Sequence, residues 1–453
     1  MSDRTIAAIA TPLGESSIGV IRISGDNAIA VADRVFFAFS GKPLSDLKGY
    51  RAAYGEIKKD GAVLDDAVAL VFKAPKSYTG EDVVEISVHG GRLLLLDILR
   101  LILENGAAPA EPGEFTKRAF LNGKTDLTKA ESIMGLISAK SDTELRLSRA
   151  AHIGKTSKKT EEIEKNLIAA DASIAAYSDY PDEDIEGLDP ESFLKMLKNA
   201  EKSLCEMLSS YDAGRIIREG IQTAIVGKPN VGKSTVMNML SGCERSIVTD
   251  IAGTTRDVIE ETVNAGGIIL RLADTAGIHT TDDKVESIGV ELAKSRIDSA
   301  ELVLAVFDCS KPLDSDDTSL IASLDRKNTI VILNKTDLEN KIDRSVFTDF
   351  RTVETAAQSG KGYDLLIKEI ADISGTASLD PDSAVLMNER QRACAVRALD
   401  GIKEAYAALE SGNTMDAVGI CVDDALSALL ELTGKRVTNE VTDEIFRRFC
   451  VGK

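Results

Sequence analysis

Short apolar runs separated by polar turns characterise the first 118 residues of the chain. They predict strands near Thr5–Ala10, Gly19–Ile23, Arg51–Ile57, Ala67–Phe72 and Val83–Val88. Two further stretches, Ala28–Phe37 and Leu93–Leu103, have apolar positions at helical spacing. The pattern therefore predicts an α/β domain over residues 1–118.

Beyond this domain the pattern becomes helical and strongly charged up to residue 215, with a break predicted at Tyr180–Ile185. Buried strands and helices alternate over 216–378, and a helical pattern returns from Met387. We expect a multidomain fold of mixed α/β and α-helical class. A second α/β domain, residues 216–378, is then inserted between the two parts of a helical domain, 119–215 and 379–453.

The apolar run that begins at Ile221 ends in a glycine-rich loop, Gly227-Lys-Pro-Asn230-Val231-Gly232-Lys233-Ser234-Thr235. Two glycines, a lysine and a hydroxyl residue at this spacing, between a strand and a helix, are typical of a phosphate-binding loop. Lys233 would reach the β and γ phosphates, and the Ser234 hydroxyl would bind Mg²⁺. The structural alternative is a simple glycine turn between a strand and a helix.

A second motif, Asn334-Lys335-Thr336-Asp337, follows the apolar run Ile330–Leu333. A carboxylate at a strand end can accept both the ring N–H and the exocyclic amine of guanine, so Asp337 is the expected specificity residue. Between the two motifs, Asp274-Thr275-Ala276-Gly277 follows another strand. The Asp274 carboxylate suits the outer shell of the metal, and the Gly277 N–H can bind the γ phosphate. Together the three motifs predict a GTPase that binds GTP and Mg²⁺.

The residue after Gly277 is Ile278, which cannot orient a water molecule for attack on the γ phosphate. Glu286, at the start of a helical stretch, is the expected replacement, and His279, Asp282 and Asp283 are the alternatives.

A second segment, Val248–Asp257, contains Thr255, whose hydroxyl is expected to complete the Mg²⁺ shell. We see no arginine that is clearly placed to neutralise charge in the transition state. Asn230 and backbone oxygens of Thr249–Thr254 can instead hold a monovalent cation, although Asn230 can equally be an amide that stabilises the loop.

The net charge of −19, from 73 acidic and 54 basic residues, argues against broad adhesion to nucleic acid or anionic membranes. An RNA partner would have to be bound at a local basic patch or through another protein. The six cysteines are scattered without close pairs, which favours a reducing cytoplasm over a disulfide framework or a zinc site. We expect neither an export signal nor a membrane span.

Several further motifs resemble one family over essentially the whole chain, the bacterial tRNA modification GTPases MnmE or TrmE, which act on the wobble uridine of certain tRNAs. The motifs are Gly19-Val-Ile-Arg22-Ile-Ser-Gly25, Tyr78-Thr-Gly-Glu-Asp-Val-Val-Glu85 through His89-Gly-Gly91, Pro112-Gly-Glu-Phe115, Arg118-Ala-Phe-Leu-Asn122-Gly-Lys124, Asp250-Ile-Ala-Gly-Thr-Thr-Arg-Asp257 and Phe449-Cys450-Val451-Gly452-Lys453.

The resemblance implies a homodimer that forms a heterotetramer with an FAD- and NADH-dependent partner protein. It implies GTP hydrolysis that depends on K⁺, and a formyl-tetrahydrofolate or related reduced folate as one-carbon source. The matching positions are Asn230, Thr249, Ile251 and Thr254 for potassium, Ser234 and Thr255 for magnesium, Glu286 for the attacking water, and Arg22, Glu85, Lys124 and Lys453 for the folate.

Cys450 resembles a catalytic thiol by residue type, but a buried apolar contact is the alternative. For Arg22 and Glu85 the alternative is a surface ion pair. The loop expected to support the base, Thr355-Ala356-Ala357, departs from the family's usual Ser-Ala-Lys, so its backbone N–H groups are expected to serve. A regulatory or ribosome-assembly GTPase without a role in base chemistry remains the second function class.

Overall fold

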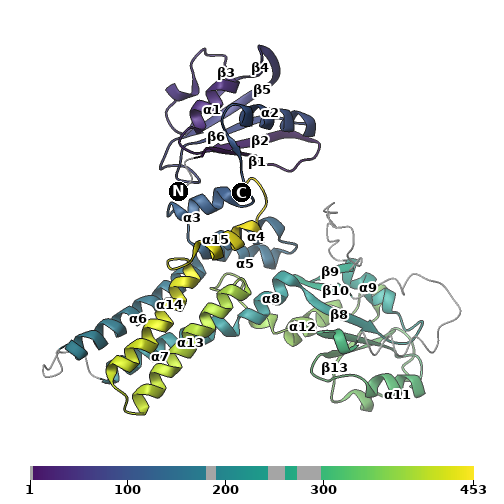
Figure 1. Ribbon diagram of the computed structural model, residues 1–453. Helices are drawn as coiled ribbons and strands as arrows, with labels where there is room; N and C mark the ends of the chain where they lie inside the picture. Colours follow the sequence, from purple (N-terminus) through teal and green to yellow (C-terminus); the bar gives the residue numbers. More distant parts are fainter. Residues whose placement is uncertain (1–3, 180–189, 243–260, 273–296) are drawn as a thin grey trace. The chain divides into compact units, whose positions relative to one another are not determined.

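The computed structural model describes residues 4–179, 190–242, 261–272 and 297–453. The chain forms two compact units, Met1–Met134 with Leu430–Lys453 (unit 1) and Gly135–Leu429 (unit 2). Both contain a β-sheet together with helices (Figure 1), which confirms the mixed α/β and α-helical class.

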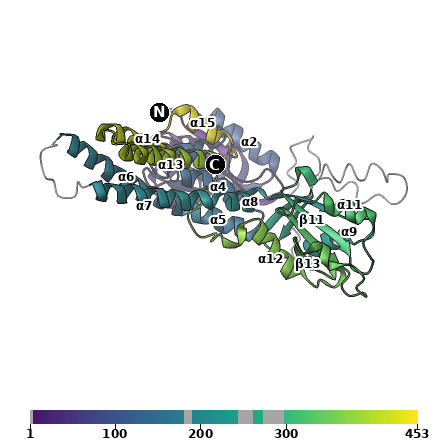
Figure 2. The same cartoon turned by 90° about the horizontal axis from the view of Figure 1, so that it is seen from below.

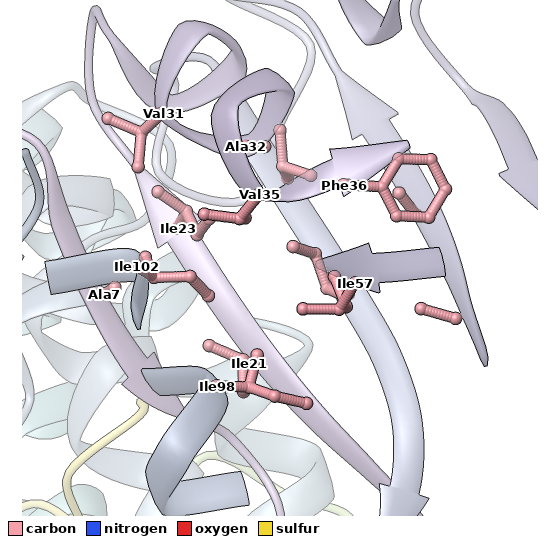
Figure 3. Packing of buried hydrophobic residues seen from close by; sticks show 14 of the residues in the cluster. Ala7, Ile21, Ile23, Val31, Ala32, Val35, Phe36, Ile57, Ile98 and Ile102 are labelled. Carbon is pink, nitrogen blue, oxygen red and sulfur yellow. The ribbon is translucent and has the colours of Figure 1, made fainter. Parts of the chain in front are cut away.

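Unit 1 contains a seven-stranded sheet in the order β3-β4-β5-β6-β2-β1-β7, in which all neighbours are antiparallel except β1 and β7. The strands are β1 (Ile6–Ile9), β2 (Ser16–Ser24), β3 (Phe36–Ala38), β4 (Arg51–Lys59), β5 (Ala62–Phe72), β6 (Val83–Gly90) and β7 (Ala108–Pro109). Helices α1 (Ala28–Val35) and α2 (Arg92–Glu104) pack their apolar sides against one face of this sheet, as Figure 3 shows. On the opposite face, Phe115 packs against Ile6 and Ala8 of β1.

The predicted helix at Ala28–Phe37 is two residues too long. The helix ends at Val35, and Phe36 begins strand β3, where it pairs with Ile57 of β4. Phe36 has extended backbone angles and a side chain that is 3% exposed. An aromatic residue that fills a sheet core favours a strand over a last helical turn.

The remaining helices of unit 1 surround a small aromatic cluster. They are α3 (Glu114–Leu121), the first part of α4 (Leu127–Ser138) and α15 (Asn439–Arg447). Phe446 and Phe449 pack there against Leu127 and Ala130. The predicted helical pattern that runs from Met387 to the end therefore stops at Arg447, and residues 450–453, which we call the tail, are not helical.

Unit 2 contains a group of long helices that lie side by side in both views (Figures 1 and 2). They are α6 (Lys155–Asp179), α7 (Pro190–Ser209), α13 (Glu389–Glu410) and α14 (Met415–Thr433). Two shorter helices, α5 (Asp142–His152) and α8 (Tyr211–Glu219), precede α6 and the second sheet respectively. No helix in the described ranges is both long enough and apolar enough to cross a membrane.

The second sheet has six strands in the order β13-β12-β11-β8-β10-β9, all parallel to their neighbours except β9 and β10. They are β8 (Ile221–Val226), β9 (Glu261–Ala265), β10 (Ile268–Leu272), β11 (Leu302–Asp308), β12 (Thr329–Asn334) and β13 (Arg351–Glu354). Helices α9 (Lys233–Gly242) and α12 (Tyr363–Ile373) cover one face, and α11 (Ser315–Ala322) packs on the other. In such sheets, ligands bind at the carboxyl ends of the strands.

Candidate functional sites

The glycine-rich loop lies where the sequence predicts, between the end of β8 and the start of α9. Gly227 and Gly232 both have positive φ, 145° and 102°. A Cβ at Gly227 would lie 2.4 Å from the Val306 carbonyl oxygen, and one at Gly232 would lie 2.3 Å from Asn334 Nδ2. Only glycine fits at either position, because both the backbone angles and the close neighbours exclude a side chain.

Lys233 lies inside this loop. Its Nζ donates to the carbonyl oxygens of Gly227 at 2.9 Å and Lys228 at 2.8 Å, and burial lowers its pKa. Ser234 is exposed on the first turn of α9, with Thr235 beside it. A lysine held by the loop and an open hydroxyl at a helix N-terminus fit the phosphates and Mg²⁺ of a bound nucleotide.

Asn334, the last residue of β12, connects three segments of the site. Its Nδ2 donates to the Val231 carbonyl oxygen at 3.0 Å, and its Oδ1 accepts hydrogen bonds of 3.1 Å from Thr355 Oγ1 and from the Ala357 amide. The side chain is almost fully buried. Asn334 therefore attaches the loop after β13 and the phosphate-binding loop to the same strand end.

Lys335, the next residue, also binds the phosphate-binding loop, at Asn230, one residue before Val231. Its Nζ donates to the Asn230 carbonyl oxygen at 2.7 Å and to Asp308 Oδ2 at 2.6 Å. Asn230 and Lys335 both have left-handed backbones, with φ of 63° and 64°. The end of β12 thus holds two consecutive carbonyls of the loop, those of Asn230 and Val231.

Asp308, which pairs with Lys335, is a site residue that was not predicted from the sequence. Burial alone would raise the pKa of Asp308, but hydrogen bonds from Lys335 and Ser310 outweigh it and hold the pKa below its usual range. A usable signal was present, because Asp308 ends the apolar strand β11 between β8 and β12. Residues at the carboxyl ends of such strands line the ligand site, and Asp308 is one of them.

Asp337 follows in the turn after Lys335 and is exposed. The Thr336 amide donates to the Thr355 carbonyl oxygen, and the Leu338 amide donates to that of Lys335. These bonds fix the turn on either side of Asp337. Its carboxylate is free to meet a base in front of the strand ends.

The triplet Thr355-Ala356-Ala357 is placed differently from our expectation. Its three backbone amides donate within the protein, to Leu333 O, Lys361 O and Asn334 Oδ1. The Thr355 side chain is buried against Asn334. In this structure the triplet therefore braces Asn334, and its amides do not point freely toward a base.

The other predicted nucleotide and cation residues lie outside the described ranges. They are Thr249, Ile251, Thr254, Thr255, Asp274, Thr275, Ala276, Gly277 and Glu286, with the alternatives His279, Asp282 and Asp283.

A second site lies in unit 1 around Arg22, on the sheet face opposite α1 and α2. Two nitrogens of its guanidinium contact Glu85 Oε1, at 2.8 and 2.9 Å, and the pair spans neighbouring strands β2 and β6. The rings of Tyr78 and Phe115 lie 5.1 and 5.5 Å from the guanidinium carbon. The Arg22 side chain is 15% exposed, so the pair is not a simple surface ion pair.

The tail packs against this second site. Arg22 Nη1 donates to the Gly452 carbonyl oxygen at 3.3 Å. At the start of α3, the amides of Gly113 and Phe115 donate to the carbonyl oxygens of Cys450 and Lys453. Amides in the first turn of a helix have no partner inside the helix, so the tail satisfies two of them.

Gly452 makes this close docking possible. It has φ of 96°, and a Cβ there would lie 2.4 Å from the Ile9 carbonyl oxygen. Cys450 is exposed, which excludes the alternative of a buried apolar contact. The Nζ of Lys124 donates to the Pro75 carbonyl oxygen, in the loop that carries Tyr78.

Two models of known protein families match this chain, and together they cover residues of both units. The model of the MnmE helical domain matches residues 127–450, and that of the GTP-binding protein TrmE N-terminus matches residues 5–124. The chain belongs to the MnmE family. Its tRNA modification GTPases from Acetivibrio thermocellus, Geobacillus kaustophilus and Lactococcus lactis are 40, 41 and 41% identical to it, over 99% of this chain and 99, 99 and 98% of theirs. The FeoB G-domain from Methanococcus jannaschii, a solved structure, is 21% identical, covers 34% of this chain and 97% of that one, and has a TM-score of 0.25.

Three charged residues that sequence analysis did not assign support the second site of this MnmE family member. Arg118, 7% exposed, donates to Glu81 at 3.0 Å and to Glu114 at 2.8 Å. Burial alone would raise the pKa of Glu114, but bonds from the Glu111 amide and Arg118 hold it below its usual range. These groups line a cleft of about 420 Å³ and hold the loop that carries Tyr78. In the sequence, Arg118 stands out only as part of its motif, because the spacing of apolar and polar residues does not reveal a buried arginine.

Proposed function

We propose that the chain is a GTP-hydrolysing enzyme that takes part in modification of the wobble uridine of certain tRNAs. The observation that carries the GTPase part is the grip of Asn334 and Lys335 on the carbonyls of Val231 and Asn230. This grip sets Asp337 and the phosphate-binding loop side by side, as one nucleotide site requires. The tRNA part is supported by the name that the full-length relatives share. GTP turnover by the purified chain tests the first part, and nucleoside analysis of tRNA from a deletion strain tests the second.

Residues 216–378 are the proposed GTPase domain, inserted between the helical parts 119–215 and 379–453, with 1–118 as a folate-binding and dimerisation domain. Ser234 and Thr255 would bind Mg²⁺, and Glu286 would orient the attacking water. The proposed product is a uridine with an aminomethyl or carboxymethylaminomethyl group at C5. An FAD- and NADH-dependent partner protein would supply the redox chemistry. Since tRNA is the substrate, we place the protein in the cytoplasm.

Potassium is the proposed activating cation, with Asn230, Thr249, Ile251 and Thr254 as ligands. The support is the exposed position of Asn230 and its left-handed backbone, which Lys335 holds. Among the described residues, the side chains that donate to carbonyl oxygens of the phosphate-binding loop include Lys233, Asn334 and Lys335.

Replacing K⁺ by Na⁺ at constant ionic strength is therefore expected to slow GTP hydrolysis strongly, while the affinity for GTP stays nearly the same. A cation placed on the transferring phosphate stabilises charge that develops only in the transition state. Single-turnover hydrolysis and equilibrium nucleotide binding, both measured in the two salts, check this. Equal hydrolysis rates in K⁺ and Na⁺ would contradict the proposal.

A reduced folate is the proposed ligand of the second site, with Arg22, Glu85, Lys124 and Lys453 in contact. A pterin presents N–H donors that suit Glu85, and the glutamyl tail presents carboxylates that suit arginine or lysine. The flanking rings of Tyr78 and Phe115 suit a flat heterocycle. Cys450 would act as a thiol on the same side, where it is exposed.

Arg22→Ala is expected to weaken binding of formyl-tetrahydrofolate by about 1.5–3 kcal/mol, or about 10- to 150-fold, since a charge-assisted contact is lost. Calorimetric titration measures the change. Arg100→Ala is the matched control, because Arg100 is an exposed arginine of α2 in the same unit, paired only with Asp97 among the described residues. Equal folate affinity in both variants would exclude Arg22 as a ligand.

A homodimer is proposed through the sheet face of unit 1 that carries Arg22. Exposed apolar side chains gather on it, among them Phe37 (46% exposed), Tyr54 (57%) and Val68 (41%). Val68 pairs across the strands with both Tyr54 and Ser87. A face of this composition is typical of a protein interface. The heterotetramer with the FAD-dependent partner would contain this dimer.

A regulatory or ribosome-assembly GTPase without base chemistry is the second candidate. It would need no folate site, so absence of reduced-folate binding by the isolated chain would favour it.

A further inference from the structure

The most basic stretch of this acidic chain lies where α5 meets α6. Residues 145–160 contain five cations and no carboxylate, and no other acid-free stretch contains as many. The cations are Arg146, Arg149, Lys155, Lys158 and Lys159, which we call the basic corner. In a chain with net charge −19, such a stretch is a strong local exception.

The fold gathers these cations on one surface. Helix α5 ends at His152 and α6 begins at Lys155, joined through Gly154, whose φ is 91°. On α6, Thr156, Thr160 and Ile163 face the interior and are buried. Lys155 and Lys158 lie on the opposite side and are exposed, as is Arg149 at the end of α5. Helical spacing thus separates the cations from the packed side of α6.

Two of the five cations in the basic corner have a carboxylate partner among the described residues. Arg146 pairs with Asp382, and Lys159 lies 3.5 Å from Glu206. The pKa of Asp382 is lowered, first by its hydrogen bond from Arg146 and also by the charges of Arg149 and Lys155. Asp382 is thus shared by three cations, and the charges of Asp142 and Asp380 also act on Arg146. Arg149, Lys155 and Lys158 form no ion pair with another described residue.

We infer that the basic corner binds the phosphate backbone of RNA, and that it is a tRNA-docking surface of this chain. The inference rests on the proposed function for the identity of the RNA. Unpaired arginine and lysine are the side chains that contact phosphates, whereas lysine is depleted at protein interfaces. The exposed apolar side chain in the turn is Ile153 (66% exposed), too small an area for a protein hot spot.

The test is the affinity of the full-length chain for an unmodified tRNA transcript, measured over a range of salt concentrations. The variant combines Arg149→Gln, Lys155→Gln and Lys158→Gln. Its dissociation constant is expected to rise about tenfold or more near physiological salt. The slope of log K against log salt concentration is expected to fall by about 2 to 3, since each lost phosphate contact removes about one released counterion.

A charge-matched control combines Lys195→Gln, Lys198→Gln and Lys202→Gln. These three lysines are also exposed, but they lie on α7. Glu206, near the end of α7, meets Lys159 near the start of α6, so Lys195 and Lys198 lie toward the other end of the helix pair, and Lys202 lies one turn before Glu206. This variant should keep the affinity and the salt slope of the wild type. Circular dichroism and GTP turnover, expected to match in all three proteins, verify folding.

Three outcomes would overturn the inference: equal losses in both variants, an unchanged affinity in the corner variant, or no measurable binding of tRNA by the wild type. Loss of tRNA modification with unchanged tRNA affinity would assign the basic corner to a protein partner instead. None of these outcomes affects the proposed function, which is tested separately by GTP turnover and by nucleoside analysis of tRNA from a deletion strain.

Discussion

Asp337→Asn is expected to lower the affinity for GTP by about 100-fold or more and to make XTP the preferred nucleotide. The carboxylate accepts two N–H donors of guanine, and each charge-assisted bond contributes about 1.5–3 kcal/mol. An asparagine offers one acceptor and one donor, which matches the exocyclic carbonyl of xanthine. Asp337 is exposed and is not a partner in the network that holds the loops, so the variant should fold normally. Competition between GTP and XTP for a fluorescent nucleotide measures the switch.

Glu339→Gln is the matched control, because it removes one exposed negative charge two residues further along. It should retain the preference for GTP. If Asp337→Asn also retains it, another residue selects the base.

Deletion of the tail, Cys450 to Lys453, is expected to abolish tRNA modification and to leave GTP hydrolysis unchanged. The tail supplies carbonyl oxygens to Arg22, Gly113 and Phe115 in unit 1, whereas the nucleotide site lies in unit 2. Removing it would expose the guanidinium of Arg22 and two helix amides to water. Nucleoside analysis of tRNA from a complemented deletion strain, beside a GTP turnover assay, measures both effects.

Point variants separate docking from chemistry. Gly452→Val should reproduce the deletion, because a side chain there would meet the Ile9 carbonyl oxygen. Val451→Ala, at a position that is 55% exposed, should keep full activity. Cys450→Ser keeps the docked tail and removes only the thiol. Full tRNA modification by the deletion or by Gly452→Val would show that the docked tail is not required.

The sequence predicts strands whose side chains are buried on both faces of the sheet, because such strands appear as continuous apolar runs. Ile330–Leu333 is such a run, and it lies inside β12. The two shortest strands, β3 and β7, were not predicted. Two or three residues cannot show a period, and their pairing depends on partners elsewhere in the chain.

The candidate sites divide in a similar way. Residues within a contiguous motif, such as Gly227, Lys233 and Asn334, could be placed from spacing alone. Asp308 could have been placed from its position at a strand end, although its ion pair with Lys335 could not. The role of Arg118 could not be predicted, because it depends on Glu81, which another element brings close. The bond from Arg22 to Gly452 spans 430 residues. Local pattern does not indicate such a contact, and only the tail motif suggested it.

This contact also has a consequence during synthesis. A ribosome adds roughly 5–20 residues per second, so Gly452 emerges about 20 to 90 s after Arg22. Six of the seven strands of the first sheet have been synthesised by Gly90, and the edge strand β7 ends at Pro109. The sheet can therefore fold early. The amides at the start of α3 gain their hydrogen-bond acceptors in the tail only after all of unit 2 has been synthesised. A nascent chain can thus acquire its nucleotide site before its site around Arg22 is finished.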